Sequence, residues 1–463
     1  MEQSRRTLAR GATALLVVAL LVPAGVSAVT YDPTDFKAGT ITDPADGPTV
    51  GGIQGFHFQG QGAKKKPARL ASVSGDGELN WRFDGSTVGA RWFYDVDPLD
   101  NGNLLVVSTN PDGTLVYELD PETREPVWTE EFDIHDTHDV DKLPNGDLVV
   151  ANMRAWDAEA EVSRDRVFVY NRSTDEVTWE WTFHEHYPNS TDGGFKKDWT
   201  HVNDVDVVDG GERFLVSPRN FDQAILINRS TKEIEMRLGS DDNHSVLDEQ
   251  HNPDWLVSED GNPTILVADS ENDRVVEYER RCGDRDPMDA PESACSWHQT
   301  WELGKGQFNW PRDADRLPNG NTLVTDSLNH RVVEVTPEGE IVWEFYATWG
   351  PYDAERVSMG GSSKGPTIAD MDKQGSYELS GSANDPPVAS ESEGGPGATL
   401  ASLGFTDLAT TWAHVTPWAK PIWMSGWAFV TTVLAGVVLL GWGLAELALN
   451  RKEIRGRVAE LAR

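Results

Sequence analysis

Apolar runs separated by turn residues recur five times along the chain. Each copy opens with a polar residue and an acidic or amide residue, passes a turn and enters an apolar run. The copies read YDVDPLDNGNLLVVS, HDVDKLPNGDLVVAN, NDVDVVDGGERFLVS, HNPDWLVSEDGNPTILVADS and RDADRLPNGNTLVTDS, and they begin at Tyr94, His138, Asn203, His251 and Arg312. Asn-Gly and Gly-Gly pairs between apolar runs are typical of β-hairpins. Each copy therefore predicts two antiparallel strands.

A second hairpin follows in each unit and ends in an aromatic strand. Such strands read VWTEEF, TWEWTF, TWELG and VWEFYA, and a further one, LNWRF around Trp81, precedes the first full unit. Four strands per repeat of this length are typical of a propeller blade. Five full units and the early half-unit predict an all-β fold, a six-bladed β-propeller, with residues 48–80 supplying the remaining strands. An open solenoid is the alternative, but a closed ring leaves no long unpaired edge.

An apolar stretch near the N-terminus predicts export. It runs from Gly11 to Ala28 and follows Arg5, Arg6 and Arg10. A basic start, an apolar middle and a small-residue end are the parts of a signal peptide. The length also suits an uncleaved membrane anchor. Both interpretations place the following chain outside the cytoplasm.

A second apolar stretch predicts a C-terminal transmembrane helix. It runs from Pro421 to Leu449 with Glu446 as its one charged residue, and it is long enough to cross a bilayer. Basic residues follow at once, at Arg451, Lys452, Arg455 and Arg457. Basic flanks are retained in the cytoplasm. We therefore expect a cell-membrane protein with a cytoplasmic C-terminus and an extracytoplasmic propeller; the basic flank disfavours the alternative of a buried helix in a soluble protein.

These features divide the chain into five parts. Residues 1–28 form a signal peptide or N-terminal anchor, 29–348 the propeller, 349–415 a linker rich in Gly, Ser, Pro and acidic residues, 416–449 the transmembrane region and 450–463 a basic tail. The linker composition is typical of a segment that buries little apolar surface.

Charge and cysteine content narrow the possible partners and environment. The formal net charge is −36, from 76 acidic and 40 basic residues, which disfavours nucleic acid because phosphate binding needs clustered Lys and Arg. Self-repulsion of this size is relieved by salt, so we interpret the composition as halophilic. Cys282 and Cys295 lie close in sequence in a polar insertion, and in an exported protein this predicts a disulfide.

The inner strands of a propeller converge on its central channel, and the equivalent position in the five units differs in residue type. It holds Tyr94, His138, Asn203, His251 and Arg312, and His201 precedes Asn203 by two residues, so it should face the same channel mouth. This variety of polar types favours a site over a purely structural ring. Imidazoles with an arginine suit an oxyanion such as sulfate or phosphate. The alternative is a metal held by three histidines, although no CxxC or HExxH pattern supports it.

Three segments carry a family resemblance. The stretch DWTHVNDVDVVDGGERFLVSPRN, Asp198 to Asn220, resembles the signature of the arylsulfate sulfotransferases, and HDTHDVDKLPNGDLVVAN and QHNPDWL resemble two further blades of that family. These are exported six-bladed propellers that move sulfuryl groups between phenols without a nucleotide sulfate donor. The resemblance implies an aryl sulfate and a phenolic acceptor as substrates, and no cofactor or metal.

The resemblance also implies roles for individual residues. His251 would be the nucleophile that becomes a sulfohistidine, His138 and His201 would flank it, and Arg219 would bind sulfuryl oxygens. Neutral imidazole is a good nucleophile, and Arg offers a fixed fork of donors. The candidate substrate-binding residues are Asn203, Arg312 and Tyr94.

Two other functions remain open from the sequence. The segments DSENDRV after Asp269 and DSLNHRV after Asp326 resemble NHL-type repeats, in which Asp, Asn and Arg tie strands together. They favour a non-catalytic propeller that binds a protein or glycan at the cell surface. A metal-dependent lyase or hydrolase on the same scaffold is the third interpretation.

Overall fold

The computed structural model describes residues 2–30, 36–55, 68–381, 395–421 and 423–451. The chain forms two compact units. One comprises Thr34–Ser390 and holds the β-sheets; the other joins Met1–Pro33 with Glu391–Arg463 and holds the long helices.

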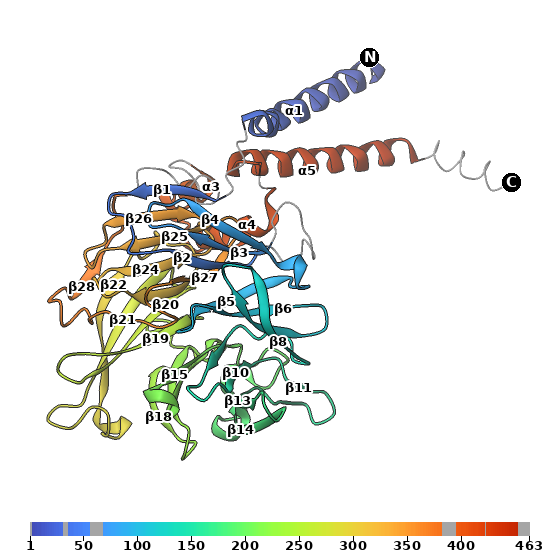
Figure 1. The fold of residues 1–463 in the computed structure, drawn as a ribbon. Coiled ribbons are helices and arrows are strands. Elements are labelled where there is room, and N and C mark those ends of the chain that lie inside the picture. Colours follow the sequence, from blue (N-terminus) through green and yellow to red (C-terminus); the bar gives the residue numbers. More distant parts are fainter. Residues whose placement is uncertain (1, 31–35, 56–67, 382–394, 422, 452–463) are drawn as a thin grey trace. The chain divides into compact units, whose positions relative to one another are not determined.

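The larger unit is the predicted six-bladed β-propeller (Figure 1). Blade 2 contains β5 (Trp92–Pro98), β6 (Leu104–Thr109), β7 (Thr114–Asp120) and β8 (Glu125–Phe132). Blade 3 contains β9 (Val140–Lys142), β10 (Leu148–Asn152), β13 (Arg166–Asn171) and β14 (Glu176–Thr182), with a separate hairpin of β11 (Trp156–Asp157) and β12 (Val162–Ser163). Blade 4 contains β15 (Val202–Val208), β16 (Arg213–Pro218), β17 (Gln223–Asn228) and β18 (Ile234–Gly239).

Blades 5 and 6 each gain a fifth strand from elsewhere in the chain. Blade 5 contains β19 (His251–Val257), β20 (Pro263–Asp269), β21 (Arg274–Arg281) and β22 (Ser296–Leu303), and β28 (Gly375–Tyr377) pairs in parallel with β22. Blade 6 contains β23 (Pro311–Arg316), β24 (Thr322–Asp326), β25 (Arg331–Val335) and β26 (Ile341–Tyr346), and β1 (Lys37–Ile41) pairs antiparallel with β26.

Blade 1 closes the ring with strands from both ends of the unit. β2 (Thr49–Ile53), β3 (Arg69–Val73) and β4 (Leu79–Asp84) come from the N-terminal side, and the innermost strand, β27 (Pro351–Arg356), comes from the C-terminal side. β27 pairs antiparallel with β2, with Thr49 opposite Arg356. The ring is therefore closed, and the open solenoid is excluded.

β27 also corrects the predicted boundary of the propeller at residue 348. The strand lies in the segment that the composition assigned to a linker, and β28 and the buried Ile368 follow it on the propeller. The physical reason is that β27 has no hairpin partner next to it in sequence, because its partner is β2. Part of the predicted linker, residues 382–394, lies outside the described residues.

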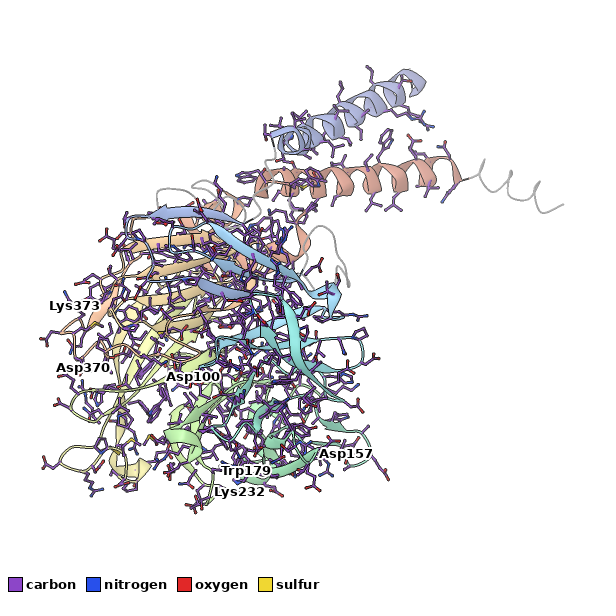
Figure 2. All side chains as sticks on the ribbon, viewed as in Figure 1. Asp100, Asp157, Trp179, Lys232, Asp370 and Lys373 are labelled. Carbon is purple, nitrogen blue, oxygen red and sulfur yellow. A yellow bond between two sulfur atoms is a disulfide. The ribbon has the colours of Figure 1, made fainter. Side chains whose placement is uncertain are left out.

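Buried tryptophans of the closing strands fasten neighbouring blades to one another. The indole N–H of Trp181 donates to the Lys232 carbonyl at 2.9 Å, and that of Trp343 donates to the Gly75 carbonyl at 2.9 Å. Trp179 donates to a carbonyl of blade 4 as well, and Lys232 lies over its ring at 5.7 Å (Figure 2). A buried indole thus contributes both apolar area and a satisfied polar group.

The NHL-like residues bond to one another within blades 5 and 6. Arg274 Nε donates to Asp269 at 2.6 Å, and Arg331 Nε donates to Asp326 at 2.7 Å. Asn272 and Asn329 complete the two motifs. These residues hold strands together, as the sequence predicted. The predicted disulfide between Cys282 and Cys295 is present.

The smaller unit consists of helices. They are α1 (Glu2–Thr30), α3 (Pro396–Ser402), α4 (Thr406–Ala419) and α5 (Gly426–Leu449). Arg6–Thr30 and Gly426–Leu449 are long and apolar enough to cross a membrane. The apolar helices expected at both ends of the chain are therefore present; the predicted basic tail lies mostly outside the described residues.

Candidate active site

Six equivalent positions of the inner strands form one ring at the channel, which we call the site ring. Its members are Tyr94, His138, Asn203, His251, Arg312 and Tyr352. All six residues are at least nine-tenths buried. Tyr352, on β27, is the member that sequence reasoning missed, because its segment was assigned to the linker. The signal was present, since PYDAER repeats the polar-then-acidic start of the other units.

His138 lies at the centre of an aromatic group. Its ring stacks on the Tyr94 ring with 3.9 Å between centroids, and it meets the His201 ring edge-on with 5.1 Å between centroids. Its Nδ1 lies 2.7 Å from Tyr352 Oη in a hydrogen bond. Burial, followed by the nearby charges of His201, His251 and Arg312, holds the pKa of His138 well below its usual range. The imidazole is therefore neutral at physiological pH.

His201 is oriented by a carboxylate. Its Nδ1 lies 2.9 and 3.0 Å from the two oxygens of Asp198, so the ring proton resides on Nδ1 and Nε2 remains a free acceptor. Burial first, and then the charge of Arg219, lower the pKa of His201 to about 4, although the bond to Asp198 acts in the opposite direction. A base held by a third group is the arrangement of acid–base catalysis in many enzymes.

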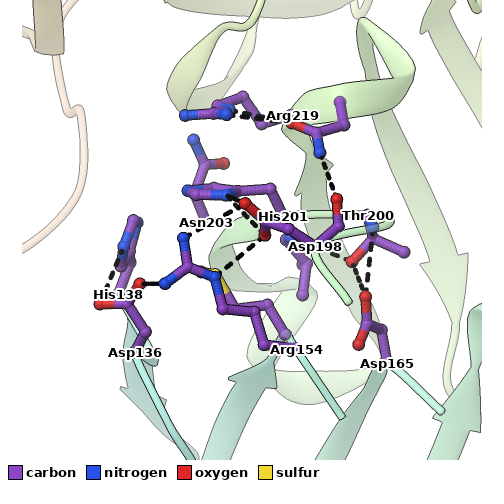
Figure 3. A network of polar contacts seen from close by, with 12 residues as sticks. Asp136, His138, Arg154, Asp165, Asp198, Thr200, His201, Asn203 and Arg219 are labelled. Atoms are coloured by element: carbon purple, nitrogen blue, oxygen red, sulfur yellow. Dashed lines mark hydrogen bonds and ion pairs between the residues drawn. The ribbon is translucent and has the colours of Figure 1, made fainter. Parts of the chain in front are cut away.

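Arg154 joins the surroundings of His138 and His201 into one network (Figure 3). Its Nε donates to Asp198 at 3.1 Å, and its Nη1 donates to Asp136. Asp136 also accepts from the Tyr94 hydroxyl and lies 3.9 Å from His138 Nε2. Sequence reasoning missed Arg154, Asp136 and Asp198; the two aspartates stand in the segments that carry the family resemblance.

His251 has its proton position set by Ser270. The Ser270 hydroxyl donates its one hydrogen to the Pro311 carbonyl at 2.7 Å and lies 2.7 Å from His251 Nδ1. Ser270 must therefore accept from Nδ1–H, which leaves the lone pair of Nε2 free. Burial, then the charges of Arg312 and Arg219, hold the pKa of His251 well below its usual range. His251 is thus a neutral imidazole with one nucleophilic nitrogen.

Two arginines supply positive charge to the three imidazoles. Arg219, at the start of the short 3-10 helix η5 (Arg219–Phe221), bonds the Asn220 side chain at 3.0 Å and Glu249 at 3.2 Å. Arg312 bonds Gln54 at 2.6 Å and lies 4.6 Å from the Tyr352 ring centroid. Both charges act on His251. The planar guanidinium group of each arginine can donate paired hydrogen bonds to the oxygens of a sulfuryl group.

Asn203, a member of the site ring, is drawn with His138, His201 and Arg219 in Figure 3. Its amide nitrogen donates to the Gln250 carbonyl at 2.9 Å. Its Oδ1 is buried without a hydrogen-bond partner. An unsatisfied buried acceptor of this kind is free to meet a donor on a bound molecule.

Several site residues adopt left-handed backbone conformations. The φ angles are 43° at His201, 62° at Asp136, 57° at Arg154 and 53° at Trp310, whose ring meets that of His251 edge-on. Such conformations cost energy for residues other than glycine and concentrate at functional sites. The observation favours a functional interpretation of the site ring.

The three imidazoles do not form a compact metal site. Among the described residues, the group whose ligand atoms lie within 4.8 Å of one another is Asp222, His244 and Asp248, which includes none of the three imidazoles. The geometry therefore gives no support to the metal-dependent lyase or hydrolase.

Comparisons with known proteins agree with the resemblance and add limited detail. Residues 53–256 match the family model described as Arylsulfotransferase (ASST), a range that contains His138, His201, Arg219 and His251. A search of curated proteins gives no match.

Solved structures are similar at low identity. A protein of unknown function from Bacteroides caccae is 13% identical, covering 65% of this chain and 93% of that chain, with a TM-score of 0.42. A streptogramin B lyase is 11% identical, covering 67% and 86%, with a TM-score of 0.39. A putative 6-phosphogluconolactonase from Bacteroides fragilis is 11% identical, covering 68% and 99%, with a TM-score of 0.41. These scores carry no functional argument. Over residues 53–256, therefore, the chain is similar to the arylsulfotransferase (ASST) family.

Proposed function

We propose that the protein transfers a sulfuryl group from an aryl sulfate to a phenolic acceptor through a sulfohistidine at His251. The observation that carries this proposal is the pair of hydrogen bonds at Ser270, which leave Nε2 of His251 as an unprotonated nucleophile. The match of residues 53–256 to the ASST family model supports the substrate class.

In the first half-reaction, His251 Nε2 attacks sulfur, the Nε2–S bond forms and the S–O bond to the aryl oxygen breaks. Arg219 and Arg312 bind the sulfuryl oxygens as the group passes between the two atoms. The anionic ester favours protonation of His201, whose imidazolium Asp198 stabilises, and that proton passes to the departing aryl oxygen. His138, Asn203 and Tyr94 line the substrate.

The second half-reaction returns the groups to their starting state. His201 Nε2 takes the proton of the acceptor phenol, the phenolate oxygen attacks sulfur and the Nε2–S bond breaks. Two easier steps replace one difficult transfer, as in other covalent mechanisms.

We propose further that the propeller lies on the extracytoplasmic side of the cell membrane and that the C-terminus is cytoplasmic. The length and apolar character of α5 support a membrane span, and Arg451 follows it directly. Basic flanks favour the cytoplasmic side.

The test is sulfuryl transfer from p-nitrophenyl sulfate to phenol by the full chain in detergent. We expect nitrophenol release that requires phenol, and we expect His251→Ala to abolish it. His298→Ala, at an exposed histidine on β22, is the matched control and should keep full activity. Circular dichroism verifies that each variant is folded.

A folded wild-type protein that is inactive with several donors would contradict the enzyme and favour the non-catalytic NHL-like propeller. Release that persists in His251→Ala would keep the enzyme but remove the sulfohistidine. Acid-quench trapping of a labelled sulfuryl group on the protein separates these outcomes.

A further inference from the structure

We propose that the propeller channel next to the site ring binds a partly hydrated divalent cation, Mg²⁺ or Ca²⁺, between two rings of carboxylates. One carboxylate ring comprises Asp95, Asp139, Asp204, Asp254, Asp313 and Asp353, and the other comprises Asp97, Asp141, Asp206, Asp315 and Glu355. All eleven line one cavity of about 40 Å³.

The two carboxylate rings follow from the repeat itself. In five blades the residue directly after the site-ring residue is aspartate, as in Tyr94-Asp95 and Tyr352-Asp353, and the next acidic residue stands two positions further along the strand. In blade 5, Asn252 and Pro253 intervene at an irregularity of the β19–β20 register, so Asp254 takes the equivalent place. Side chains alternate between the two faces of a strand, so residues two positions apart point the same way, and both acidic residues of a blade face the channel.

In several of these carboxylates, one oxygen accepts a hydrogen bond from a backbone N–H of a neighbouring blade. Asp353 accepts from the Val96 backbone N–H at 2.8 Å, Asp139 accepts from that of Val205 at 2.5 Å, and Asp313 accepts from that of Ala354 at 3.3 Å. This structural role accounts for one hydrogen bond of each of these three side chains; Asp139 also shares a hydrogen bond with Asp95, and Asp313 with Asn252.

Two channel oxygens lack any partner among the described residues. Asp204 Oδ2 and Glu355 Oε2 are buried and make no hydrogen bond, and these two residues are at most 6% exposed. By contrast, Asp95 shares a hydrogen bond with Asp139, and Asp315 shares one with Asp254. A buried acceptor without a donor is costly. Oxygens that face a shared cavity therefore indicate a ligand that supplies positive charge.

Among the described residues, the charge of Arg316 acts on Asp254 from beyond ion-pair distance, because Arg316 forms its ion pair with Glu277. None of the eleven carboxylates has a Lys, Arg or His within ion-pair distance in the described part of the chain. Burial and the neighbouring carboxylates raise the pKa of Asp95, Asp204 and Asp315 well above its usual range. The channel must therefore hold either protons or a cation.

The size and shape of the cavity favour a cation with water. A volume of about 40 Å³ exceeds the ~10–15 Å³ that one water needs. The compact ligand group in the described residues lies elsewhere, at Asp222, so three channel oxygens do not meet at one point. Mg²⁺ commonly keeps several waters and binds through few direct carboxylates, and Ca²⁺ accepts flexible oxygen shells.

The experiment uses the full chain in detergent, treated with EDTA and dialysed into 150 mM NaCl, about physiological ionic strength. We expect calorimetric titration with Mg²⁺ or Ca²⁺ to give one saturable site and to raise the Tm by about 5 °C, because a ligand of the native state alone stabilises it. The double variant Asp204→Asn/Asp206→Asn should bind at least tenfold more weakly.

Two further measurements keep the result interpretable. The control Asp100→Asn/Asp112→Asn removes two exposed carboxylates and should bind like the wild type. Because amides relieve repulsion, the channel variant should melt above the wild type in EDTA, which shows that it folds. Absence of binding heat together with an unchanged Tm at about 10 mM of either cation, far above the Kd of an ordinary site, would overturn the proposal.

A second, independent inference concerns the helical unit: we infer that α1 is retained as a membrane-spanning partner of α5. Arg10 donates from Nε and Nη2 to the two oxygens of Glu446, each at 2.7 Å. Near the other end of α1, Ser27 Oγ lies 3.2 Å from Ser425 Oγ and accepts from the Ser425 backbone N–H at 3.1 Å. Contacts at opposite ends make the two helices antiparallel.

Cleavage after Ala28 would remove both sets of contacts. It would leave Glu446 without Arg10 in a helix that is otherwise free of charge, and a charged group in such a helix is costly without a partner. The buried contacts of Ala24 with Met424 and Ala428 would be lost as well. Retention of α1 also places both chain termini on the same side of the membrane.

The test combines mass measurement with cross-linking. We expect the intact mass of the purified protein to include residues 1–28, and Ser27→Cys/Ser425→Cys to form a disulfide under mild oxidation. Thr13→Cys/Ser425→Cys, with one cysteine at the far end of α1, is the control and should not cross-link. A purified protein that begins after residue 28 would overturn the inference, and so would a full-length protein in which both cysteine pairs fail to react.

Discussion

At the scale of single residues, the proton on His251 decides whether its imidazole can act as a nucleophile. Ser270 holds that proton on Nδ1 because its own hydrogen is used by the Pro311 carbonyl. We expect Ser270→Ala to lower kcat by about 10- to 100-fold, by analogy with groups that orient metal-ligating histidines, and to leave KM nearly unchanged. Ser270→Thr keeps the hydroxyl and should restore most of kcat; equal losses in both variants would contradict this role.

The pKa of His201 makes a separate prediction about pH. The free imidazole is neutral down to about pH 4, so kcat/KM, which reports the free enzyme, should fall on the acid side near pH 4 and not near pH 6.5. Asp198→Asn removes the carboxylate that favours protonation and should move this limb to lower pH. Initial rates measured between about pH 3.5 and 8 provide the measurement, since the lower limit extends about half a pH unit below the expected limb. An acid limb near pH 6.5 would contradict the buried environment of His201.

Some residues of the candidate site could be predicted from the sequence and others could not, for physical reasons. His138, His201, His251 and Arg219 stand in segments whose spacing is visible in the repeat and in the family resemblance. Ser270 and Arg154 reach the site from neighbouring strands and loops, so only the folded chain brings them to the imidazoles. No local pattern marks such residues in one sequence.

At the scale of elements, β27 is the strand on which closure depends. Its Ala354 N–H donates to Asp313, and Ala354 pairs with Gly51 of β2. Ala354→Pro removes this donor from the innermost strand of blade 1 and should destabilise the propeller by about 1 to 3 kcal/mol, because the buried Asp313 carboxylate loses a hydrogen bond. Ala354→Ser keeps the N–H and serves as the control. Urea unfolding followed by tryptophan fluorescence measures the difference, and equal midpoints for the two variants would contradict the importance of this strand.

The four antiparallel strands of each of blades 2 to 6 were predictable because they follow one another in sequence, with strong turn signals between them; the added strands β28 and β1 were not predicted. Blade 1 was predictable only in part, since β2, β3 and β4 precede the first full unit and β27 follows the last one. Pairing of this kind depends on the register between distant strands, which periodicity within a short window does not contain.

At the scale of the whole molecule, the buried carboxylates set the pH dependence of stability. Burial, opposed in part by the bond from the Val205 N–H, raises the pKa of Asp139 to about 7, and burial raises those of Asp141 and Asp254 to about 6. A raised folded pKa contributes stability that is present below the unfolded pKa near 4 and is lost as pH rises through 6 to 7. The lowered pKa values of the three site histidines act in the opposite direction between about pH 6.5 and 4, but the carboxylates outnumber them.

We therefore expect the Tm measured in EDTA to fall as pH rises from about 5 to 8, the window that spans these raised pKa values. Saturating Mg²⁺ should flatten this slope, because the cation replaces the protons that the carboxylates release. Calorimetric scans at fixed ionic strength provide the measurement. A Tm that rises over this range in EDTA would show that the channel carboxylates are not the dominant groups.

Closure by β27 also sets the order of events in time. Until residue 356 has been synthesised and exported, β2 has no partner on its inner edge, and five blades stand as an open array with an unpaired strand at one end. Exposed strand edges invite pairing with other chains. The ring therefore cannot close before β27 arrives, and the nascent protein depends on protection of one edge for as long as this inner strand is still in transit.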